Sequence, residues 1–139
     1  MESLNEKQKQ CAHTALKGKN MFISGAAGVG KSFLLRVLVK LLNEKYIKKG
    51  KAAVAVTALT GIAAITIEGT TLHSFAGMGH DLSKTVSWVA RNRWRQTKVL
   101  IIDEVSMMTD EFLEKIFEFI KLYKVQIICF GDFYQLNPI

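Results

Sequence analysis

A glycine-rich segment that ends in a lysine and a serine is the first feature of this sequence that could do chemistry. It reads Gly25, Ala26, Ala27, Gly28, Val29, Gly30, Lys31, Ser32, which fills every fixed position of the pattern G-x-x-x-x-G-K-S. The glycines let the backbone curl so that successive amide N–H groups point at a chain of phosphates. Lys31 can add a mobile cation at the outer phosphates, and the Ser32 hydroxyl can ligate Mg²⁺. A turn that only connects two elements is the alternative, but the complete pattern favours a phosphate-binding loop.

Two adjacent carboxylates form the second candidate for chemistry. The apolar run Val99–Ile102 leads directly into Asp103 and Glu104. In open parallel sheets, ligands bind at the carboxyl ends of the strands. If this strand lies near the phosphate-binding loop, Asp103 would hold Mg²⁺ through water and Glu104 would orient or deprotonate an attacking water. A helix cap or turn is the alternative. A glutamate directly after the aspartate favours hydrolysis over phosphoryl transfer to a small molecule.

The elements that must position these groups alternate along the chain. Four apolar runs are typical of strands buried on both faces: 21–24, 52–57, 99–103 and 125–131. Three segments have apolar residues at helical spacing: 5–17, 31–46 and 110–123. Strand and helix in alternation predict an α/β fold with a parallel sheet. Residues 58–98 are the least regular stretch, with Thr, Gly and Ser clusters and then a basic segment that holds both tryptophans.

Composition narrows the class of protein. The chain has 139 residues, of which 49% are hydrophobic, which suits one globular domain. No apolar run approaches the ~20 residues that cross a bilayer, and the polar start does not resemble a secretory signal. The two cysteines are too few for a disulfide framework. We therefore expect an intracellular domain with reduced thiols and no membrane contact.

The net charge of +7 is unevenly distributed. Residues 1–98 hold sixteen Lys or Arg against five Asp or Glu, whereas residues 99–139 hold three against seven. A basic first part is what a phosphate-binding or nucleic-acid-binding surface needs, because phosphate contacts release counterions. Ordinary solvated lysines remain the alternative from charge alone.

A third motif, Gly131–Leu136, has the pattern G-D-x-x-Q-L. With it, the sequence resembles the Pif (petite integration frequency) family of superfamily 1 DNA helicases, which have RecD-type helicases as close relatives. The resemblance covers nearly the whole chain, in order. It consists of Leu4, Asn5 and Gln8 for the Q motif, Gly25–Ser32 for Walker A, Val56–Ala64 and Gly69–Gly77 for motif Ia, Ile101–Met108 for Walker B and Gly131–Leu136 for motif III.

The resemblance implies a RecA-like P-loop NTPase core, with three α/β/α layers and a mainly parallel sheet, that binds ATP and Mg²⁺. Gln8 would read the adenine edge, and Gln135 would sense the γ-phosphate. Lys31, Ser32, Asp103 and Glu104 would keep the roles given above. As alternatives, Gln8 would be a surface residue and Gln135 a polar loop residue.

The resemblance also implies that the T-x-H-S-F stretch Thr70–Phe75 lies against single-stranded DNA. The DNA contacts implied there and just before it are Thr60, Gly61, Thr71, His73 and Phe75. Hydroxyls and backbone amides suit phosphates, and aromatic rings stack on bases without sequence preference. For Phe75 alone, a place in the core is the favoured alternative. His73 could be a structural histidine, although DNA contact is slightly favoured.

The basic segment 83–98 offers further DNA contacts. If it is helical, Trp88, Arg91 and Arg95 share one face, and Ala90 and Trp94 share another. Arg91 and Arg95 would then lie beside DNA. The equally weighted alternative is a helix with solvated arginines, packed by both tryptophans. No cysteines or histidines have metal-ligand spacing, and Cys129 is expected in the core.

Two departures from the family pattern bear on function. Asn137 stands where the family usually has proline, which puts the local loop shape in doubt. Nothing follows motif III, so we expect residues 1–139 to be the first RecA-like motor domain, without the second domain and its arginine finger. An exposed sheet edge is then expected beside the strand that precedes the phosphate-binding loop.

The resemblance implies that the full protein is an ATP-driven motor that moves 5′ to 3′ on single-stranded DNA and separates duplexes at junctions. We expect a monomeric chain that binds nucleotide with little turnover. DNA repair, recombination and telomere maintenance are the implied processes. Nucleus, mitochondrion, bacterial cytoplasm and virus-infected cell are not distinguished. Two rivals remain: a P-loop ATPase or kinase acting on another substrate, and a non-catalytic, ATP-responsive nucleic-acid-binding module.

Overall fold

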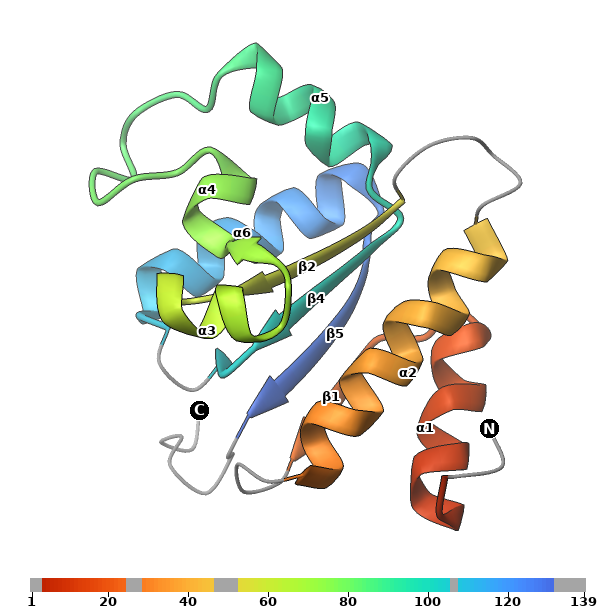
Figure 1. Ribbon diagram of the computed structural model, residues 1–139. Helices are drawn as coiled ribbons and strands as arrows, with labels where there is room; N and C mark the ends of the chain where they lie inside the picture. Colours follow the sequence, from red (N-terminus) through yellow and green to blue (C-terminus); the bar gives the residue numbers. More distant parts are fainter. Residues whose placement is uncertain (1–3, 25–28, 47–52, 106–107, 132–139) are drawn as a thin grey trace.

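The computed structural model describes residues 4–24, 29–46, 53–105 and 108–131 of the chain, and the side chains of residues 29 and 30 are not described. Their strands form one parallel sheet in the order β1-β5-β4-β2-β3 (Figure 1). The strands are β1 (Met21–Ser24), β2 (Val54–Ala58), β3 (Thr70–Thr71), β4 (Val99–Asp103) and β5 (Gln126–Gly131). The α/β class and the four predicted strands are confirmed, with small shifts at their ends.

Helices cover both faces of this sheet. They are α1 (Glu6–Leu16), α2 (Val29–Tyr46), α3 (Gly61–Thr66), α4 (Leu72–Ala76), α5 (Trp88–Gln96) and α6 (Asp110–Tyr123). Figure 1 shows α1 and α2 together on one side, and α4, α5 and α6 on the other. The three helices expected from apolar spacing are confirmed, and the structure adds α3, α4 and β3 in the irregular stretch.

Two hydrophobic cores explain why the strands lack an alternating pattern. All five residues of β4 are buried. Leu100 and Ile102 belong to the core beneath α4, α5 and α6, whereas Val99 and Ile101 belong to the core beneath α1 and α2. Successive side chains of a strand point to opposite faces, so a strand covered on both sides must be apolar throughout. Each fully buried apolar side chain contributes about 1.5–3 kcal/mol.

The carboxyl ends of the strands meet at one edge of the sheet and place the candidate functional residues there. In register, Thr71 of β3 pairs with Ala58 of β2, and Ala58 pairs with Asp103 of β4. Thr60 follows β2 by two residues, and β1 leads into the glycine-rich segment. A single row of the sheet therefore connects the motif Ia region with the carboxylates.

β1 is the outermost strand on one side of the sheet. Among the described residues it pairs only with β5. The Phe22 side chain of β1 is 56% exposed. The expected exposed edge beside the phosphate-loop strand is therefore confirmed for the described residues. Among the helices of the described ranges, none is both long and apolar enough to cross a membrane.

Candidate nucleotide and DNA sites

Lys31 lies between the two predicted acidic residues. Its Nζ is 2.8 Å from Glu104 Oε1, to which it donates a hydrogen bond, and 2.9 Å from Asp103 Oδ1. The side chains of Lys31 and Asp103 are only 12% and 9% exposed, and that of Glu104 is 30% exposed. Lys31 is thus 72 positions from Asp103 in sequence, but the three charged residues form one cluster at the carboxyl ends of the strands, as the sequence predicts.

The local backbone explains how this cluster forms. Lys31 lies in the first turn of α2, directly after the glycine-rich segment, and Asp103 is the last residue of β4. Glu104 has φ 59°, in the left-handed region. This conformation costs a non-glycine residue about 1–2 kcal/mol. Such strain persists where the surroundings determine it, and it is concentrated at functional sites.

Charge and burial act in opposite directions on Lys31. Burial lowers the pKa of Lys31, but hydrogen bonds and the negative charges of Glu104 and Asp103 raise it, so that its pKa lies above the usual value. The ammonium group therefore stays protonated at neutral pH. It remains a cation suited to the outer phosphates of a nucleotide.

The cluster also fits Mg²⁺. Asp103 Oδ1 is buried and lies 2.9 Å from Lys31 Nζ, at the carboxyl end of β4. A carboxylate oxygen in this position suits a hard cation that prefers oxygen ligands. Ser32 adjoins Lys31 and can supply a hydroxyl. Within the described ranges, no group of three or more His, Cys, Asp or Glu could hold a metal ion. Mg²⁺ sites commonly use one or two carboxylates together with substrate phosphates and water.

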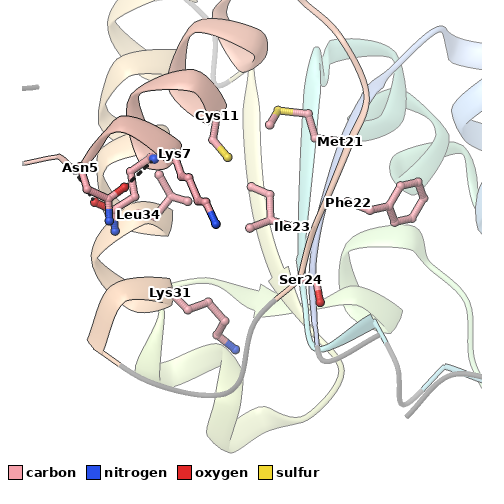
Figure 2. Close-up of a pocket in the computed structure, with 10 residues that line it drawn as sticks. Asn5, Lys7, Cys11, Met21, Phe22, Ile23, Ser24, Lys31 and Leu34 are labelled. Atoms are coloured by element: carbon pink, nitrogen blue, oxygen red, sulfur yellow. Dashed lines mark hydrogen bonds between the residues drawn. The ribbon is translucent and has the colours of Figure 1, made fainter. Parts of the chain in front are cut away.

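A cavity of about 360 Å³ adjoins Lys31 and is formed by α1, β1 and the start of α2 (Figure 2). Its lining residues are Asn5, Lys7, Gln8, Cys11, Met21, Phe22, Ile23, Ser24, Lys31 and Leu34. The volume is typical of small-molecule sites, which span ~300–1,000 Å³. The structure therefore brings the Q-motif glutamine and the Walker lysine to one cavity.

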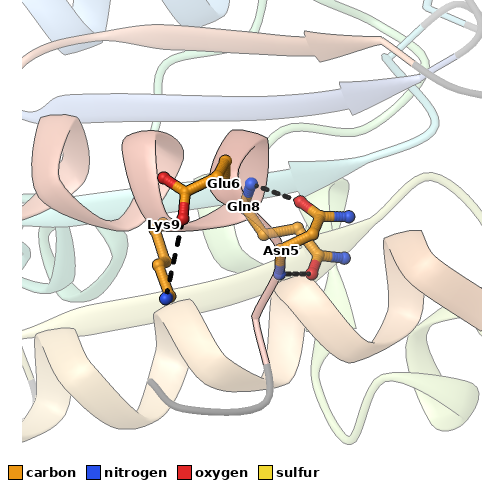
Figure 3. A network of polar contacts seen from close by, with 4 residues as sticks. All are labelled: Asn5, Glu6, Gln8 and Lys9. Carbon is orange, nitrogen blue, oxygen red and sulfur yellow. Dashed lines mark hydrogen bonds and ion pairs between the residues drawn. The ribbon is translucent and has the colours of Figure 1, made fainter.

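Gln8 also closes the amino end of α1 (Figure 3). The Asn5 N–H donates to Gln8 Oε1 over 3.0 Å, and the Gln8 N–H donates to Asn5 Oδ1 over 2.9 Å. This reciprocal capping box satisfies two helix-end donors and fixes the Gln8 side chain. Gln8 is half-buried and lines the cavity, and its role toward the adenine base stays a prediction.

Several predicted nucleotide-site residues fall outside the described residues. They are Gly25, Ala26, Ala27, Gly28 and Gln135, together with Asn137. Val29 and Gly30 form the first two positions of α2. The roles assigned to all of these residues stay predictions.

Four of the predicted DNA contacts gather at the carboxyl ends of β2 and β3. Thr60 caps α3 by accepting the Ala63 N–H, and Gly61 is the first residue of that helix. Thr71 caps α4 by accepting the Ser74 N–H, and α4 carries His73. These caps are the local reason why two short helices begin there.

His73 has an aromatic neighbour as well. Its ring stacks on Phe112 of α6 with centroids 4.1 Å apart. Burial and the nearby His80 lower the pKa of His73, so the imidazole is neutral at pH 7. A cavity of about 150 Å³ joins His73 and Thr60 to the end of the Walker B motif and the start of α6, and its other lining residues are Leu59, Met108, Thr109 and Phe112.

Phe75 does not belong with these contacts. It is 6% exposed, and its ring packs edge-on against Trp94 with centroids 5.0 Å apart. The expectation of a DNA contact at Phe75 is therefore wrong. The alternative of a core residue is confirmed, because burial against an indole leaves the ring inaccessible to a base.

The structure does not bring Arg91 and Arg95 to the same edge as Thr60. Arg91 donates to Tyr123 Oη at the end of α6, and its guanidinium lies 5.1 Å from the Phe119 ring centroid. Arg95 lies 5.9 Å from the Tyr123 ring centroid. Because Tyr123 precedes β5 and α5 precedes β4, both arginines lie toward the amino ends of the strands. Their assignment as DNA contacts stays an untested prediction.

The tryptophans of α5 differ from each other. Ala90 and Trp94 are buried, as predicted for their shared face, at 1% and 0% exposure. Trp88 is 72% exposed, so the alternative with both tryptophans packed inward is wrong. Sequence reasoning also missed Arg93, which donates to the Phe75 and Ser74 carbonyl oxygens. Helical spacing gives no signal for a bond to a neighbouring helix end.

Comparison with known proteins agrees with this geometry. The family model for "PIF1-like helicase" matches residues 3–139. The chain is 45% identical to the ATP-dependent DNA helicase PIF1 of Emericella nidulans over 88% of this chain and 18% of that protein. It is 43% identical to the PIF1 helicase of Candida albicans over 98% of this chain and 16% of that protein. The chain thus spans less than a fifth of the length of these relatives.

The fold matches solved helicase structures. The Pif1 helicase structure from Candida albicans superposes with a TM-score of 0.80 at 41% identity, over 100% of this chain and 34% of that one. The structure of Bacteroides Pif1 in complex with ADP-AlF3 and ssDNA gives a TM-score of 0.76 at 30% identity, over 98% of this chain and 34% of that one. The sheet and its flanking helices are therefore those of a RecA-like domain in a Pif1 helicase. From the motif order, the sheet and these matches together, the chain belongs to the PIF1-like helicase family.

Proposed function

We propose that this chain is the first RecA-like motor domain of an ATP-dependent DNA helicase, and that it binds ATP with Mg²⁺ and one side of a single strand of DNA. The contact of Lys31 with both Asp103 and Glu104 carries the proposal. It places a phosphate-binding cation against two carboxylates at the edge of the sheet that also carries Thr60 and Thr71.

The residues of the nucleotide site have separate tasks. Lys31 holds the outer phosphates, and Gln8 faces the base from the α1 side of the cavity. Ser32 and Asp103 would hold Mg²⁺, which when bound neutralises phosphate charge during hydrolysis. Glu104 orients the attacking water or accepts its proton. Gln135 senses the γ-phosphate.

The DNA side consists of Thr60, Gly61, Thr71 and His73. Hydroxyls and helix-start amides suit phosphate oxygens, and a neutral imidazole suits the face of a base. The register Thr71–Ala58–Asp103 makes this side the immediate neighbour of the nucleotide site. A movement of β4 relative to β2 would therefore change the contacts with both the nucleotide and the DNA.

Translocation from 5′ to 3′ and duplex separation belong to the whole protein under this proposal. The relatives are several times longer than this chain, and arginine fingers in related phosphoryl-transfer sites supply ~10³–10⁵ of rate. We expect these 139 residues to bind nucleotide, to turn it over slowly and to unwind no duplex.

Fluorescence anisotropy of a labelled single-stranded oligonucleotide at low and moderate salt tests the DNA half of the proposal. We expect salt-sensitive binding that Mg²⁺ with an ATP analogue changes, and we expect Lys31→Ala to abolish that nucleotide effect. A metabolite kinase would show no DNA binding at either salt concentration. A non-catalytic binding module would hold DNA tightly, and Lys31→Ala would change nothing.

A further inference from the structure

Side chains of α5 hold the carboxyl end of α4. Arg93 Nε donates to the Phe75 carbonyl oxygen over 3.0 Å, and Arg93 Nη2 donates to the Ser74 carbonyl oxygen over 3.3 Å. The next carbonyl, that of Ala76, accepts from Trp94 Nε1 over 3.2 Å. Two adjacent residues of α5 thus bind the three last carbonyl groups of α4.

The short helix α4 needs such support. It has only five residues, far below the ~12 at which an isolated helix is even marginally stable in water. The last four carbonyl groups of any helix lack partners within the helix. A guanidinium suits two neighbouring carbonyls because its N–H groups point in fixed directions.

The two helices also approach too closely for an ordinary residue at their junction. Gly77, the C-cap of α4, has φ 73°, and a Cβ placed on it would lie 2.4 Å from the Cβ of Ala90. Trp94 is fully buried and contacts Phe75 and Phe119 edge-on. The position of α4 is therefore set by α5 through polar bonds and close packing together.

We propose that Arg93 and Trp94 are positioning residues for DNA binding: they fix α4 so that Thr71 and His73 are presented to single-stranded DNA. This inference rests on the proposed function. Arg93 is exposed, and it directs two of its N–H groups at backbone carbonyls of α4, so it can act on DNA binding through α4 without a phosphate contact of its own. In this way α5 contributes to DNA binding by holding α4 in position.

The test compares single-stranded DNA affinity, its salt dependence and nucleotide affinity in Arg93→Ala, Arg93→Lys and Trp94→Phe. The phenylalanine variant keeps a buried aromatic ring but removes the N–H donor and part of the indole volume, so its free energy of unfolding is measured alongside its DNA affinity. Lys121→Ala is the charge-matched control, since Lys121 is an exposed cation on α6. Melting temperatures, together with amide exchange at residues 72–78, report whether α4 has loosened.

We expect Arg93→Ala to weaken DNA binding about tenfold, as the loss of hydrogen bonds from a charged donor implies, and to leave nucleotide affinity within about twofold. Arg93→Lys should rescue little, because an ammonium cannot span both carbonyls. Trp94→Phe should weaken DNA binding about threefold, and amide exchange in α4 should accelerate in each variant. The slope of log affinity against log salt should equal that of the wild type.

A slope reduced by about one unit with full rescue by lysine would overturn the inference and make Arg93 a direct phosphate contact. Unchanged DNA affinity in Arg93→Ala and Trp94→Phe would also overturn it, while leaving the proposed function intact. If the wild-type chain itself bound no DNA, the proposed function and this inference would fail together.

Discussion

Three charged side chains share a small and mostly buried volume at the carboxyl ends of the strands. Lys31, Asp103 and Glu104 carry one positive and two negative charges within hydrogen-bonding distance. Desolvation of charged groups is costly unless each has a partner. Lys31 therefore stabilises the two carboxylates in the ligand-free chain, and under the proposed function it also holds the outer phosphates of a nucleotide.

A double-mutant cycle between Lys31 and Asp103 measures this dependence. We expect Lys31→Ala to lower the free energy of unfolding by about 1–3 kcal/mol, because it leaves the buried Asp103 carboxylate without its cation. The loss should be at least about 1 kcal/mol smaller when Asp103→Asn is already present. Urea unfolding at pH 7 gives the four values. Strictly additive losses would show that the two groups do not interact.

The two cysteines should differ in their reactivity toward thiol reagents. Burial raises the pKa of Cys129 to about 12 and also raises the pKa of the half-buried Cys11. At pH 8 Cys129 is therefore almost entirely the thiol, and the thiolate is the reactive form. With a disulfide reagent, Cys129 should react only as fast as the chain unfolds, and Cys11 should react faster.

Cys11 additionally lines the cavity beside Gln8, so bound nucleotide should slow its modification. Cys11→Ser assigns the two kinetic phases, and denaturant should make both thiols react at once. Equal rates for both cysteines in the native chain would contradict the burial of Cys129. A Cys11 rate that nucleotide leaves unchanged would argue against a base in this cavity.

Long helices and strands with a regular apolar pattern could be predicted from the sequence, whereas the shortest helices and strands could not. The helices α2 and α6 and strands β4 and β5 have many apolar residues at a clear period or in a run, because each packs over its full length on a core. The elements α3, α4 and β3 contain six, five and two residues, too few to show a period. Only their capping threonines, Thr60 and Thr71, signal them.

The carboxyl end of α6 offers a prediction about backbone conformation. Lys124 is the C-cap, with φ 55° and ψ 51°. A left-handed lysine costs about 1 kcal/mol, and glycine adopts this conformation freely. We expect Lys124→Gly to raise the free energy of unfolding by about 0.5–1 kcal/mol, measured by urea unfolding.

Lys121→Gly is the matched control, since Lys121 lies within the last turn of the same helix with helical backbone angles. There, glycine should lower the free energy of unfolding by about 0.5–1 kcal/mol. The same sign for both substitutions would show that the conformation at Lys124 does not determine the outcome.

Across the molecule, the sequence predicted the cluster of Lys31, Asp103 and Glu104 better than the packing around the proposed DNA contacts. Motif order and the carboxyl-edge rule for parallel sheets bring Lys31, Asp103 and Glu104 together whatever the lengths of the connections. The DNA side depends on how α4 and α5 pack, which no local pattern encodes. Phe75 therefore proved to be a core residue, and Arg93 was overlooked.

The outer strand β1 should influence whether copies of the chain associate. Phe22 on β1 is 56% exposed, and Figure 2 shows its ring pointing away from Lys31. Unpaired edge strands with apolar side chains promote pairing between chains. We expect the chain to be monomeric when dilute and to associate when concentrated. Phe22→Lys should raise the concentration at which light scattering detects association.

Leu122→Lys is the control, because Leu122 is similarly exposed, at 62%, but lies on a helix. It should leave the association threshold within about twofold, and both variants should unfold within about 0.5 kcal/mol of the wild type. An equal effect of the two substitutions would assign association to general surface hydrophobicity instead of the β1 edge.

Nucleotide binding by the chain decides whether Lys31 and its carboxylate neighbours form an ATP site. A fluorescent ATP analogue is titrated into the wild type, Lys31→Ala and Lys40→Ala, with Mg²⁺ and with a chelator, while circular dichroism verifies that each variant is folded. Lys40 is an exposed lysine on the same helix and serves as the control. We predict saturable binding that weakens at least about tenfold in Lys31→Ala and on removal of Mg²⁺, and that Lys40→Ala leaves unchanged. Binding of equal strength in folded Lys31→Ala, or no binding by the wild type, would contradict the account.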